Sequence, residues 1–381
     1  MFKKFNMSLA AAFFTLIGLG SVQVSYAEDA KAPKWYDTVN VSGFVDGYYS
    51  YNMNGPQSHK NAFHNFDFVS NDFNVSLVEL NIVKPVDETN RAGFYIGLAF
   101  GEAADAVACA GTIPCPATNL ESTYKNFRQA YASMLLMPGL QLDFGKFVTQ
   151  HGSEVIESKD NWNYTRSILF AWAIPYYHTG ARLTYTLNDQ LTLMGDVVNG
   201  WNSTVETNNG KTYGIQAMVT PVKSLPIIIN YMTGPEIIAG TVSDTKSLLD
   251  VVVTYNVTDS ISLMANYDDG IQKQGLGVGA GDAKWSGYAL YGKYAITPSM
   301  AIVARVEQLD DKDGFATATN LGTGGQKLKE GTLTLEHSAP GGCLVRLDLR
   351  QDKSDQDVFT KEDGTPTSTQ NTVTLGVVHT F

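Results

Sequence analysis

The chain has 381 residues, of which 44% are hydrophobic, 11% aromatic and only 17% charged. The charged fraction lies well below the roughly 25% of soluble domains, and the chain is too apolar and aromatic to be disordered. Beyond the first 27 residues there is no run of about 18 apolar residues, which excludes transmembrane helices. These bounds leave either several soluble domains or a membrane protein built from strands.

The first residues have the order of a secretory signal peptide. Lysines at positions 3 and 4 give a positive start, an apolar stretch covers 9–19, and Ser25-Tyr26-Ala27 places small residues where a signal peptidase reads them. The apolar stretch is too short to span a bilayer. We therefore expect export, with residues 1–27 removed by cleavage after Ala27.

The charge balance of the exported chain argues against nucleic acid as a partner. Cleavage removes two lysines and no acidic residue, leaving 25 basic against 38 acidic side chains and a net charge of −13. Binding to nucleic acid rests on cationic contacts to phosphate, which such a chain lacks. An acidic surface suits a cell exterior instead, where divalent cations bridge anionic lipid.

Two of the three cysteines lie close together in the sequence. Cys109 and Cys115 are six positions apart in a loop rich in Gly, Ala and Pro. Because export is expected, a local disulfide is favoured over a metal site, which would need further Cys or His nearby. The third, Cys343, we expect to act as a small apolar residue on a strand, and no metal is expected.

Period-two alternation of apolar and polar residues predicts sixteen strands. Most are long enough to cross a bilayer, which takes roughly 9–11 tilted residues. They are expected at 38–50, 72–84, 91–101, 123–137, 139–148, 174–187, 190–200, 210–220, 225–233, 245–257, 259–269, 283–296, 299–309, 327–338, 341–351 and 371–381.

The connections between these strands are alternately short and long. Seven are short and made of turn-forming residues, at 85–90, 138, 188–189, 221–224, 258–259, 297–298 and 339–340. Eight are long and rich in Gly, Asn, Asp and Thr, at 51–71, 102–122, 149–173, 201–209, 234–244, 270–282, 310–326 and 352–370. A soluble sandwich has no reason to put every long loop on one side, whereas an outer-membrane barrel has short periplasmic turns and long extracellular loops.

The sequence therefore predicts an all-β fold, a single transmembrane antiparallel β-barrel of about 16 strands. We expect it to cover 38–381, after a periplasmic segment at 28–37. Eight strands would leave a barrel filled by its own side chains, whereas sixteen leave an aqueous channel. We expect passive diffusion of ions and small hydrophilic solutes through that channel.

The connection 149–173 differs from the other long loops. It mixes charges and amides with three aromatic residues and the apolar stretch 168–173, which an exposed loop would rarely carry. We expect it to fold into the barrel and narrow it; a surface flap and a subunit-contact loop are the alternatives. Its charged residues are then candidates to line the constriction, namely Glu154, Glu157, Lys159, Asp160 and Arg166.

Strand parity places further charges on the inward face. The carboxylates are Glu79, Asp143, Asp196, Asp250, Asp268, Glu307, Glu330, Glu336 and Asp348, and the cations are Arg182, Lys293, Arg305, Arg346 and Arg350. Among them, Arg182, Asp196, Arg305, Glu307, Arg346 and Asp348 are our candidates for pore-lining residues. Nine carboxylates against five cations predict at most a mild cation preference. Alternatively, these charges pair across strands and only keep the wall hydrated, or the aromatic residues Trp162, Tyr164, Trp172, Tyr176 and Tyr177 form a stacking track for sugars.

No motif predicts an enzyme or a cofactor. His151-Gly152-Ser153 offers an imidazole and a hydroxyl with Glu154 and Glu157 nearby, but adjacency in a loop does not supply the mutual hydrogen bonds that a nucleophile needs. Asp311-Lys-Asp-Gly314 resembles part of a calcium loop, yet the first ligand position and the closing glutamate are missing. We therefore expect neither catalysis nor a bound cofactor.

Six short segments carry a family resemblance. Val41-Ser-Gly-Phe-Val-Asp-Gly-Tyr-Tyr49 opens the first strand, and Gln129-Ala-Tyr-Ala-Ser133, Leu142-Asp-Phe-Gly-Lys146, His151-Gly-Ser-Glu-Val155, Ile174-Pro-Tyr-Tyr-His-Thr-Gly-Ala-Arg182 and Asp196-Val-Val-Asn-Gly-Trp201 follow. Together they resemble the OmpL-like outer-membrane β-barrel porins of Gram-negative bacteria, over essentially the whole mature chain.

The resemblance implies a Gram-negative outer membrane, with its lipid and lipopolysaccharide as partners, and a porin for passive diffusion of small solutes. The terminal Phe381 resembles the final aromatic residue that barrel-assembly machinery recognises, which adds that machinery as a partner. His379 departs from the pattern, because an aromatic residue often stands there. No substrate-binding residue carries over from the family.

Two other functions stay open at this point. The long loops could make the barrel a surface adhesin or a structural protein, and aromatic residues could make it a sugar-selective channel. Large porins are commonly oligomers, so a homo-oligomer is possible by analogy, but the sequence specifies no subunit number.

Overall fold

A computed structural model of the chain describes residue 34 and residues 36–109, 119–318 and 324–381. The predicted signal peptide, most of the expected periplasmic segment 28–37 and Cys115 lie outside these residues. Both the cleavage after Ala27 and the pairing of Cys109 with Cys115 therefore stay predictions. Cys343 is a free cysteine on a strand of the wall.

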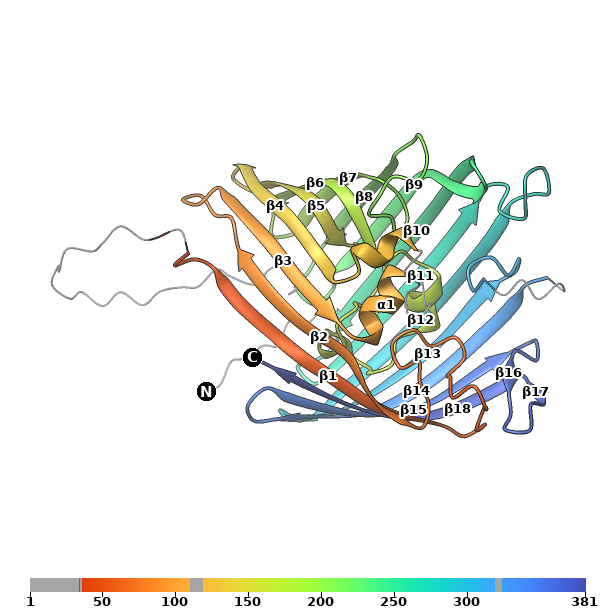
Figure 1. Ribbon diagram of the computed structural model, residues 1–381. Helices are drawn as coiled ribbons and strands as arrows, with labels where there is room; N and C mark the ends of the chain where they lie inside the picture. Colours follow the sequence, from red (N-terminus) through yellow and green to blue (C-terminus); the bar gives the residue numbers. More distant parts are fainter. Residues whose placement is uncertain (1–33, 35, 110–118, 319–323) are drawn as a thin grey trace.

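Sixteen antiparallel strands form one closed barrel, as predicted (Figure 1). The strands are β1 (Asn40–Asn52), β2 (Asp72–Lys84), β3 (Ala92–Phe100), β4 (Phe127–Met137), β5 (Leu140–Val148), β6 (Tyr177–Asn188), β7 (Leu191–Val198), β8 (Thr212–Val219), β9 (Ile227–Ala239), β10 (Val242–Asn256), β11 (Ile261–Gln272), β12 (Ala283–Thr297), β13 (Met300–Asp311), β14 (Gln326–Ala339), β15 (Cys343–Ser354) and β18 (Thr369–Thr380). Each pairs with its neighbours in sequence, and β18 pairs with β1 to close the ring.

The remaining elements belong to the long loops. A two-stranded hairpin of β16 (Phe359–Thr360) and β17 (Pro366–Thr367) lies before β18. Two short helices, α1 (Glu102–Ala108) and α2 (Ile168–Trp172), and the 3-10 turns Leu120–Thr123 and Ser158–Asp160 complete the described chain. No helix among the described residues has both the length and the apolar character to cross a membrane.

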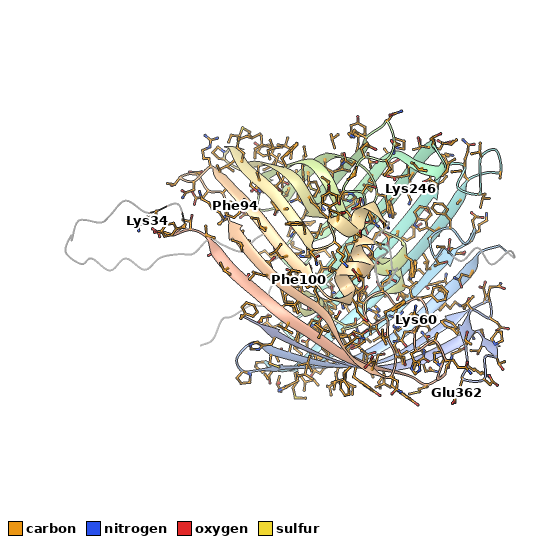
Figure 2. All side chains as sticks on the ribbon, viewed as in Figure 1. Lys34, Lys60, Phe94, Phe100, Lys246 and Glu362 are labelled. Carbon is orange, nitrogen blue, oxygen red and sulfur yellow. The ribbon has the colours of Figure 1, made fainter. Side chains whose placement is uncertain are left out.

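The wall carries its apolar residues outside and its polar residues inside. On β14, Leu333 and Leu335 are 50% and 44% exposed, whereas Thr332 before them and Thr334 between them are buried. Aromatic side chains such as Phe94 and Phe100 stand at the two ends of β3 (Figure 2). An apolar exterior around a polar interior is the arrangement of a membrane barrel and the reverse of a soluble one. Parity alone gives two faces and cannot tell which of them points outward.

One predicted loop is wrong. The stretch 234–244 is a hairpin, because β9 runs to Ala239 and β10 begins at Val242. Pro235 suggests a break, since proline cannot donate to a ladder. Its carbonyl, however, accepts a hydrogen bond of 2.8 Å from Asn208 in the loop after β7. In an antiparallel strand, the carbonyl and the nitrogen of one residue face the same neighbouring strand. The nitrogen of Pro235 therefore faces away from β10, and no hydrogen bond between β9 and β10 is lost.

The seam between the first and last strands is completed by the final residue. The backbone of Phe381 exchanges two hydrogen bonds of 3.0 Å with Gly43 at the start of β1. A Cβ at Gly43 would lie 2.6 Å from the Phe381 ring, so the glycine makes room for it. The last residue of the chain is thus part of the closed wall.

Candidate channel constriction

The loop 149–173, between β5 and β6, crosses the interior of the barrel. Ser158 donates a hydrogen bond of 2.6 Å to Asp46 on β1. The amide of Ser153 donates one of 2.9 Å to Asn266 on β11, and that of Gly152 donates one of 3.1 Å to Asp250 on β10. Because β1 and β10 lie nearly opposite each other in the closed strand order, the loop spans the lumen from wall to wall. We call it the inward loop.

The sequence of the inward loop explains its shape. Gly152 adopts a positive φ of 88°, which only glycine does without strain. Ser167 caps α2 by accepting a hydrogen bond of 3.0 Å from the amide of Phe170. Asn161 fixes the bend before it, donating to the carbonyl of Val155 and accepting from its amide. The apolar residues that follow in α2 are buried inside the barrel.

Two glycines of the wall leave room for side chains of the inward loop. A Cβ at Gly376 on β18 would lie 2.0 Å from Cδ2 of Tyr164, and a Cβ at Gly287 on β12 would lie 2.3 Å from Cδ1 of Leu169. Any larger residue at either glycine would therefore collide with the loop. The fit is specific to this loop in this position.

Wall carboxylates accept hydrogen bonds from the backbone of the inward loop. Asp348 on β15 accepts from the amides of Tyr164 and Thr165 at 3.1 and 2.8 Å. Glu307 on β13 accepts from those of Ile168 and Leu169 at 2.7 and 3.0 Å. The Glu307 bonds satisfy amides at the start of α2, which have no partner within the helix.

Wall arginines bind the carbonyls of the same loop. Arg305 on β13 donates to the carbonyl of Thr165 at 2.6 Å and forms an ion pair with Glu154 of the loop at 2.8 Å. Arg346 donates to the carbonyls of Ser158 and Asn161, and Arg350 to that of Arg166 at 2.7 Å. Four of the predicted pore-lining residues, Arg305, Glu307, Arg346 and Asp348, therefore hold the inward loop.

The other candidate charges of the inward loop are also partnered. Arg166 packs 4.6 Å from the ring centroid of Phe66 and donates to the carbonyl of Tyr164. Glu157 forms an ion pair with Arg128 on β4. Lys159 and Asp160 pair with each other at 2.5 Å, and their side chains remain 28% and 46% exposed. They are the most accessible of the five charged candidates on the loop.

The last two candidates lie on the wall between β5 and β7. Arg182 and Asp143 form a buried ion pair of 2.8 Å across β6 and β5. Asp196 on β7 accepts a hydrogen bond of 2.8 Å from Gln150 of the inward loop. Neither Arg182 nor Asp196 contacts the exposed pair on the loop in any described bond, so the structure does not gather all eleven candidates at one point.

Inward side chains of the wall are buried around most of the barrel. One inward residue from each of fourteen strands is between 0% and 7% exposed there: Asp46, Glu79, Arg128, Asp143, Arg182, Asp196, Asn230, Asp250, Asp268, Tyr291, Arg305, Glu330, Asp348 and Thr374. A side chain on the wall of an open aqueous channel would be wet. Among the described residues, then, this ring of the wall is covered.

Other long loops also fold back into the barrel, which sequence reasoning missed. His64, in the loop after β1, binds Asp67 at 2.8 Å and Asp352 on β15 at 2.9 Å. Burial and Arg350 lower the pKa of His64, but the two carboxylates outweigh them and raise it above its ordinary value. The aromatic residues of 62–68, alternating with polar ones, were the signal for this: like 149–173, they are too apolar for an exposed loop.

A lysine joins two further loops at the same end. The ammonium of Lys246, on β10, lies 4.0 Å from the ring centroid of Trp201 and 5.3 Å from that of Phe315. Trp201 belongs to the loop after β7 and Phe315 to the loop after β13. This cation–π cluster draws the two loops together over the barrel.

The histidine and serine considered for catalysis bind different partners. His151 lies 3.2 Å from the Thr149 hydroxyl, while Ser153 donates to the hydroxyl of Tyr291 at 3.4 Å. Burial, with the neighbouring His178 adding to it, lowers the pKa of His151 to about 3. Within the described parts of the chain there is no group of three or more side chains that could hold a metal ion.

Comparison with known proteins identifies a family and a fold. The family model described as "Putative beta-barrel porin-2, OmpL-like" matches residues 38–381. A search of curated proteins finds no match.

Solved structures give the fold alone, because their identities are low. The outer-membrane channel DcaP of Acinetobacter baumannii is 15% identical, with a TM-score of 0.60 over 90% of this chain and 97% of that one. An anion-selective porin from Comamonas acidovorans is 12% identical, with a TM-score of 0.62 over 90% and 99%. OmpT of Vibrio cholerae in its trimer form is 10% identical, with a TM-score of 0.54 over 90% and 99%.

Proposed function

Because the chain belongs to the OmpL-like family of β-barrel porins, we propose that it is a passive outer-membrane channel for ions and small hydrophilic solutes, with the inward loop setting its conductance. The observation that carries the proposal is the wall-to-wall crossing of the loop between Asp46 and Asp250. Sixteen strands enclose an aqueous channel, so whatever crosses the lumen limits the flow.

The covered ring at the level of the loop favours a channel with a restricted state and a wider one. With the inward loop seated, conductance is low because polar wall residues are bound to it. When the loop leaves the wall, the same carboxylates and arginines face water and conductance rises. The loop is bound mostly through hydrogen bonds and ion pairs, which water can replace once it enters.

Ion selectivity is proposed to be weak. Buried charges of the wall form ion pairs with each other, as Arg305 does with Glu330 at 2.9 Å and Arg346 with Glu336 at 2.7 Å. The exposed charges at the loop are one lysine and one aspartate, Lys159 and Asp160. Rings of unpaired charge set ion preference in pores, and a balanced pair does not. One structural relative is an anion-selective porin, so the sign of the preference needs measurement.

The test is single-channel current in a planar bilayer for the wild type and for a deletion of 153–164. We expect small steps from the wild type and larger ohmic steps from the deletion. A deletion of 276–280, in the exposed loop after β11, is the matched control and should behave as the wild type. Equal currents from all three proteins would reject the role of the loop.

The same current recordings distinguish the proposed channel from a sugar-selective channel and from an adhesin or structural protein. A reversal potential in a KCl gradient gives the ion preference, and block by oligosaccharides would favour a sugar-selective channel. If both deletion and wild type are folded and neither conducts, the adhesin or structural function replaces the channel.

Export and assembly complete the proposal. We propose cleavage after Ala27 and a disulfide between Cys109 and Cys115; the intact mass of protein purified from outer membranes, before and after reduction, tests both.

We also propose that barrel-assembly machinery recognises Phe381, and loss of folded protein on deletion of Phe381 tests this. Finally, we propose a homo-oligomer, supported by the trimer form of a structural relative; the mass of the native complex tests it.

A further inference from the structure

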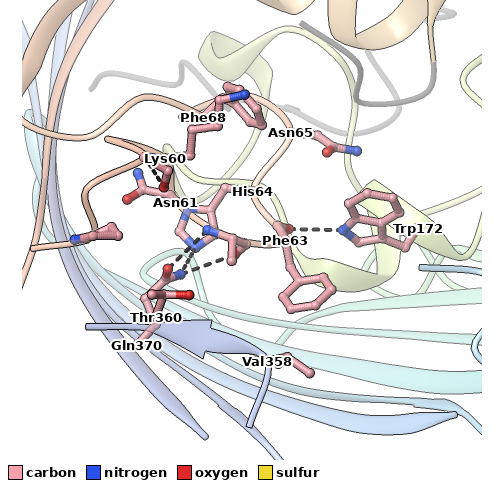
Figure 3. Close-up of a pocket in the computed structure, with 13 residues that line it drawn as sticks. Lys60, Asn61, Phe63, His64, Asn65, Phe68, Trp172, Val358, Thr360 and Gln370 are labelled. Atoms are coloured by element: carbon pink, nitrogen blue, oxygen red, sulfur yellow. Dashed lines mark hydrogen bonds between the residues drawn. The ribbon is translucent and has the colours of Figure 1, made fainter. Parts of the chain in front are cut away.

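A cavity of about 300 Å³ lies at the long-loop end of the barrel, outside the inward loop's contacts with the wall. It is bordered by the loop after β1, by Trp172 at the end of α2, and by the loop that carries the β16–β17 hairpin (Figure 3). That volume is at the lower end of the range for small-molecule sites and equals about ten waters of liquid.

Aromatic rings form one side of the cavity and hold each other in place. The indole N–H of Trp172 donates a hydrogen bond of 3.0 Å to the carbonyl of Phe63. The Phe63 ring meets that of Trp172 edge to face at 6.3 Å between centroids, and that of Phe359 at 5.7 Å. Trp172 and Phe63 are only partly buried. The cavity thus has rigid ring faces ready for an apolar, flat ligand.

The polar groups at the floor of the cavity are occupied by the protein itself. Both ring nitrogens of His64 bind carboxylates, as described above. Gln370 accepts from the amides of Asn52 and Ala62 at 2.9 and 3.0 Å. Asn61 donates to Ser50 and to the carbonyl of Asp67. Because Asp67 and Asp352 are buried and bound to His64, the floor presents no accessible negative charge among its described residues.

The accessible charge of the cavity is the ammonium of Lys60. Its side chain is exposed, and the ammonium lies 4.9 Å above the Phe68 ring rather than against a carboxylate. Figure 3 shows Lys60 beside Phe68 and apart from Phe63 and Trp172. The lining of the cavity therefore combines an accessible cation with aromatic rings. The hydroxyls of Ser58 and Thr360 also border the space.

We propose that this cavity binds a small organic anion that carries a flat ring, such as an aromatic carboxylate. The ring lies against the faces of Phe63 and Trp172, and the carboxylate meets the ammonium of Lys60. A sugar would need a set of polar partners around its ring, whereas the lining is mostly apolar and its amides are already bonded. The site does not depend on conduction, so failure of either proposal leaves the other standing.

The test measures binding to the full-length mature protein folded in detergent, by ligand-detected NMR and calorimetry. The probes are benzoate, its neutral analogue benzamide, acetate, which has the charge without the ring, and methyl glucoside. We expect benzoate to bind tightest, benzamide about fivefold more weakly, as loss of one exposed charge pair allows, and acetate and the glucoside not measurably.

Substitutions of single residues test which side chains bind the ligand. Lys60→Gln should weaken benzoate about fivefold and leave benzamide unchanged, while Lys60→Arg keeps benzoate binding. Trp172→Leu should weaken both ring compounds. Lys329→Gln, an exposed lysine on the outer wall of β14, is the control and should change nothing.

Three results would overturn the proposal. They are binding of no probe by folded wild type, equal binding of benzoate and benzamide, and binding of methyl glucoside in place of benzoate. Equal loss in Lys60→Gln and Lys329→Gln would reject the placement of the carboxylate. Heat-modifiable mobility on gels confirms that every variant is a folded barrel before binding is measured.

Discussion

The two halves of the barrel interior differ in their access to water. Towards the long loops and at the level of the inward loop, inward side chains such as Arg182 and Asp348 are buried. Towards the short turns, inward residues such as Ser133, Thr186 and Gln216 are partly exposed. The same sixteen strands form both halves, so the wall itself does not cause the difference.

The difference comes from the length of the connections. A two-residue turn such as Pro138-Gly139 or Asp189-Gln190 cannot reach the lumen, whereas a loop of nineteen residues or more can fold back into it. The inward loop and the loop after β1 both do so. Unequal connections thus give a barrel that is wet at the periplasmic end and filled towards the outside.

The largest effect is expected from Arg305→Ala. This arginine ties together Glu154 of the inward loop, Glu330 of the wall and the carbonyl of Thr165. Its removal leaves buried carboxylates without their cation, a change that typically costs about 3–5 kcal/mol. Unfolding in urea should show that loss, and conductance should rise as the loop detaches. Lys329→Ala is the control, and equal stability of the two variants would contradict the role of Arg305.

Gly376→Ala should release the inward loop while the strands stay paired. The added Cβ meets the Tyr164 ring at 2.0 Å, and overpacking of this kind costs about 1–3 kcal/mol. Gly331→Ala on β14 is matched to it, because a Cβ there meets nothing within 4 Å. Single-channel recordings should show larger steps only for Gly376→Ala. Similar steps from both variants would mean that the loop does not limit the current.

Raising the pH through the pKa of His64 should loosen the loop after β1. Because the pKa of His64 is raised in the folded protein, its stabilising contribution is complete below the ordinary histidine pKa. That contribution is lost as pH rises through the raised value. The difference in unfolding free energy between wild type and His64→Gln should therefore shrink with rising pH. Hydrogen exchange over 53–71 should quicken in the same range in the wild type, and a pH-independent difference would refute this.

The smallest effect is expected from Thr186→Lys at the wet end of the barrel. Thr186 points inward on β6 and is partly exposed, so a lysine there would add a charge to the part of the channel that we propose ions enter. The reversal potential in a KCl gradient should move slightly towards anions, with conductance changed less than by Gly376→Ala. Thr186→Gln controls for size. No shift relative to Thr186→Gln would mean that ions do not pass this position.

The fold could be predicted because each strand carries its own signal. Alternation in segments such as 327–338 marks both the strand and its inward charges, Glu330 and Glu336. The hairpin around Pro235 was missed because sequence shows that proline lacks a donor but not which way its nitrogen faces. Only the pairing with Thr245 and the bond to Asn208 decide that.

The site could be predicted only in part, for a related reason. Parity gives the face on which Arg305 or Asp348 stands, but not which loop will cover it. Both residues have partners in the inward loop, more than a hundred residues earlier in the chain. The apolar run in 149–173 indicates that this loop is unusual, while the bonds that it makes are set by the tertiary structure.

The pairing of β1 with β18, which Gly43 and Phe381 complete, also determines the stage of synthesis at which the barrel can close. Every other strand of the barrel pairs with strands made just before and after it, but β1 must wait for β18, the last strand of the barrel to be synthesised. Until then both strands are open edges, ready to pair with a foreign chain. Contacts this distant in sequence are slow to form. We therefore expect a chain truncated before β18 to accumulate in the periplasm as an aggregation-prone intermediate. Such a chain should be degraded by proteases instead of being inserted into the membrane.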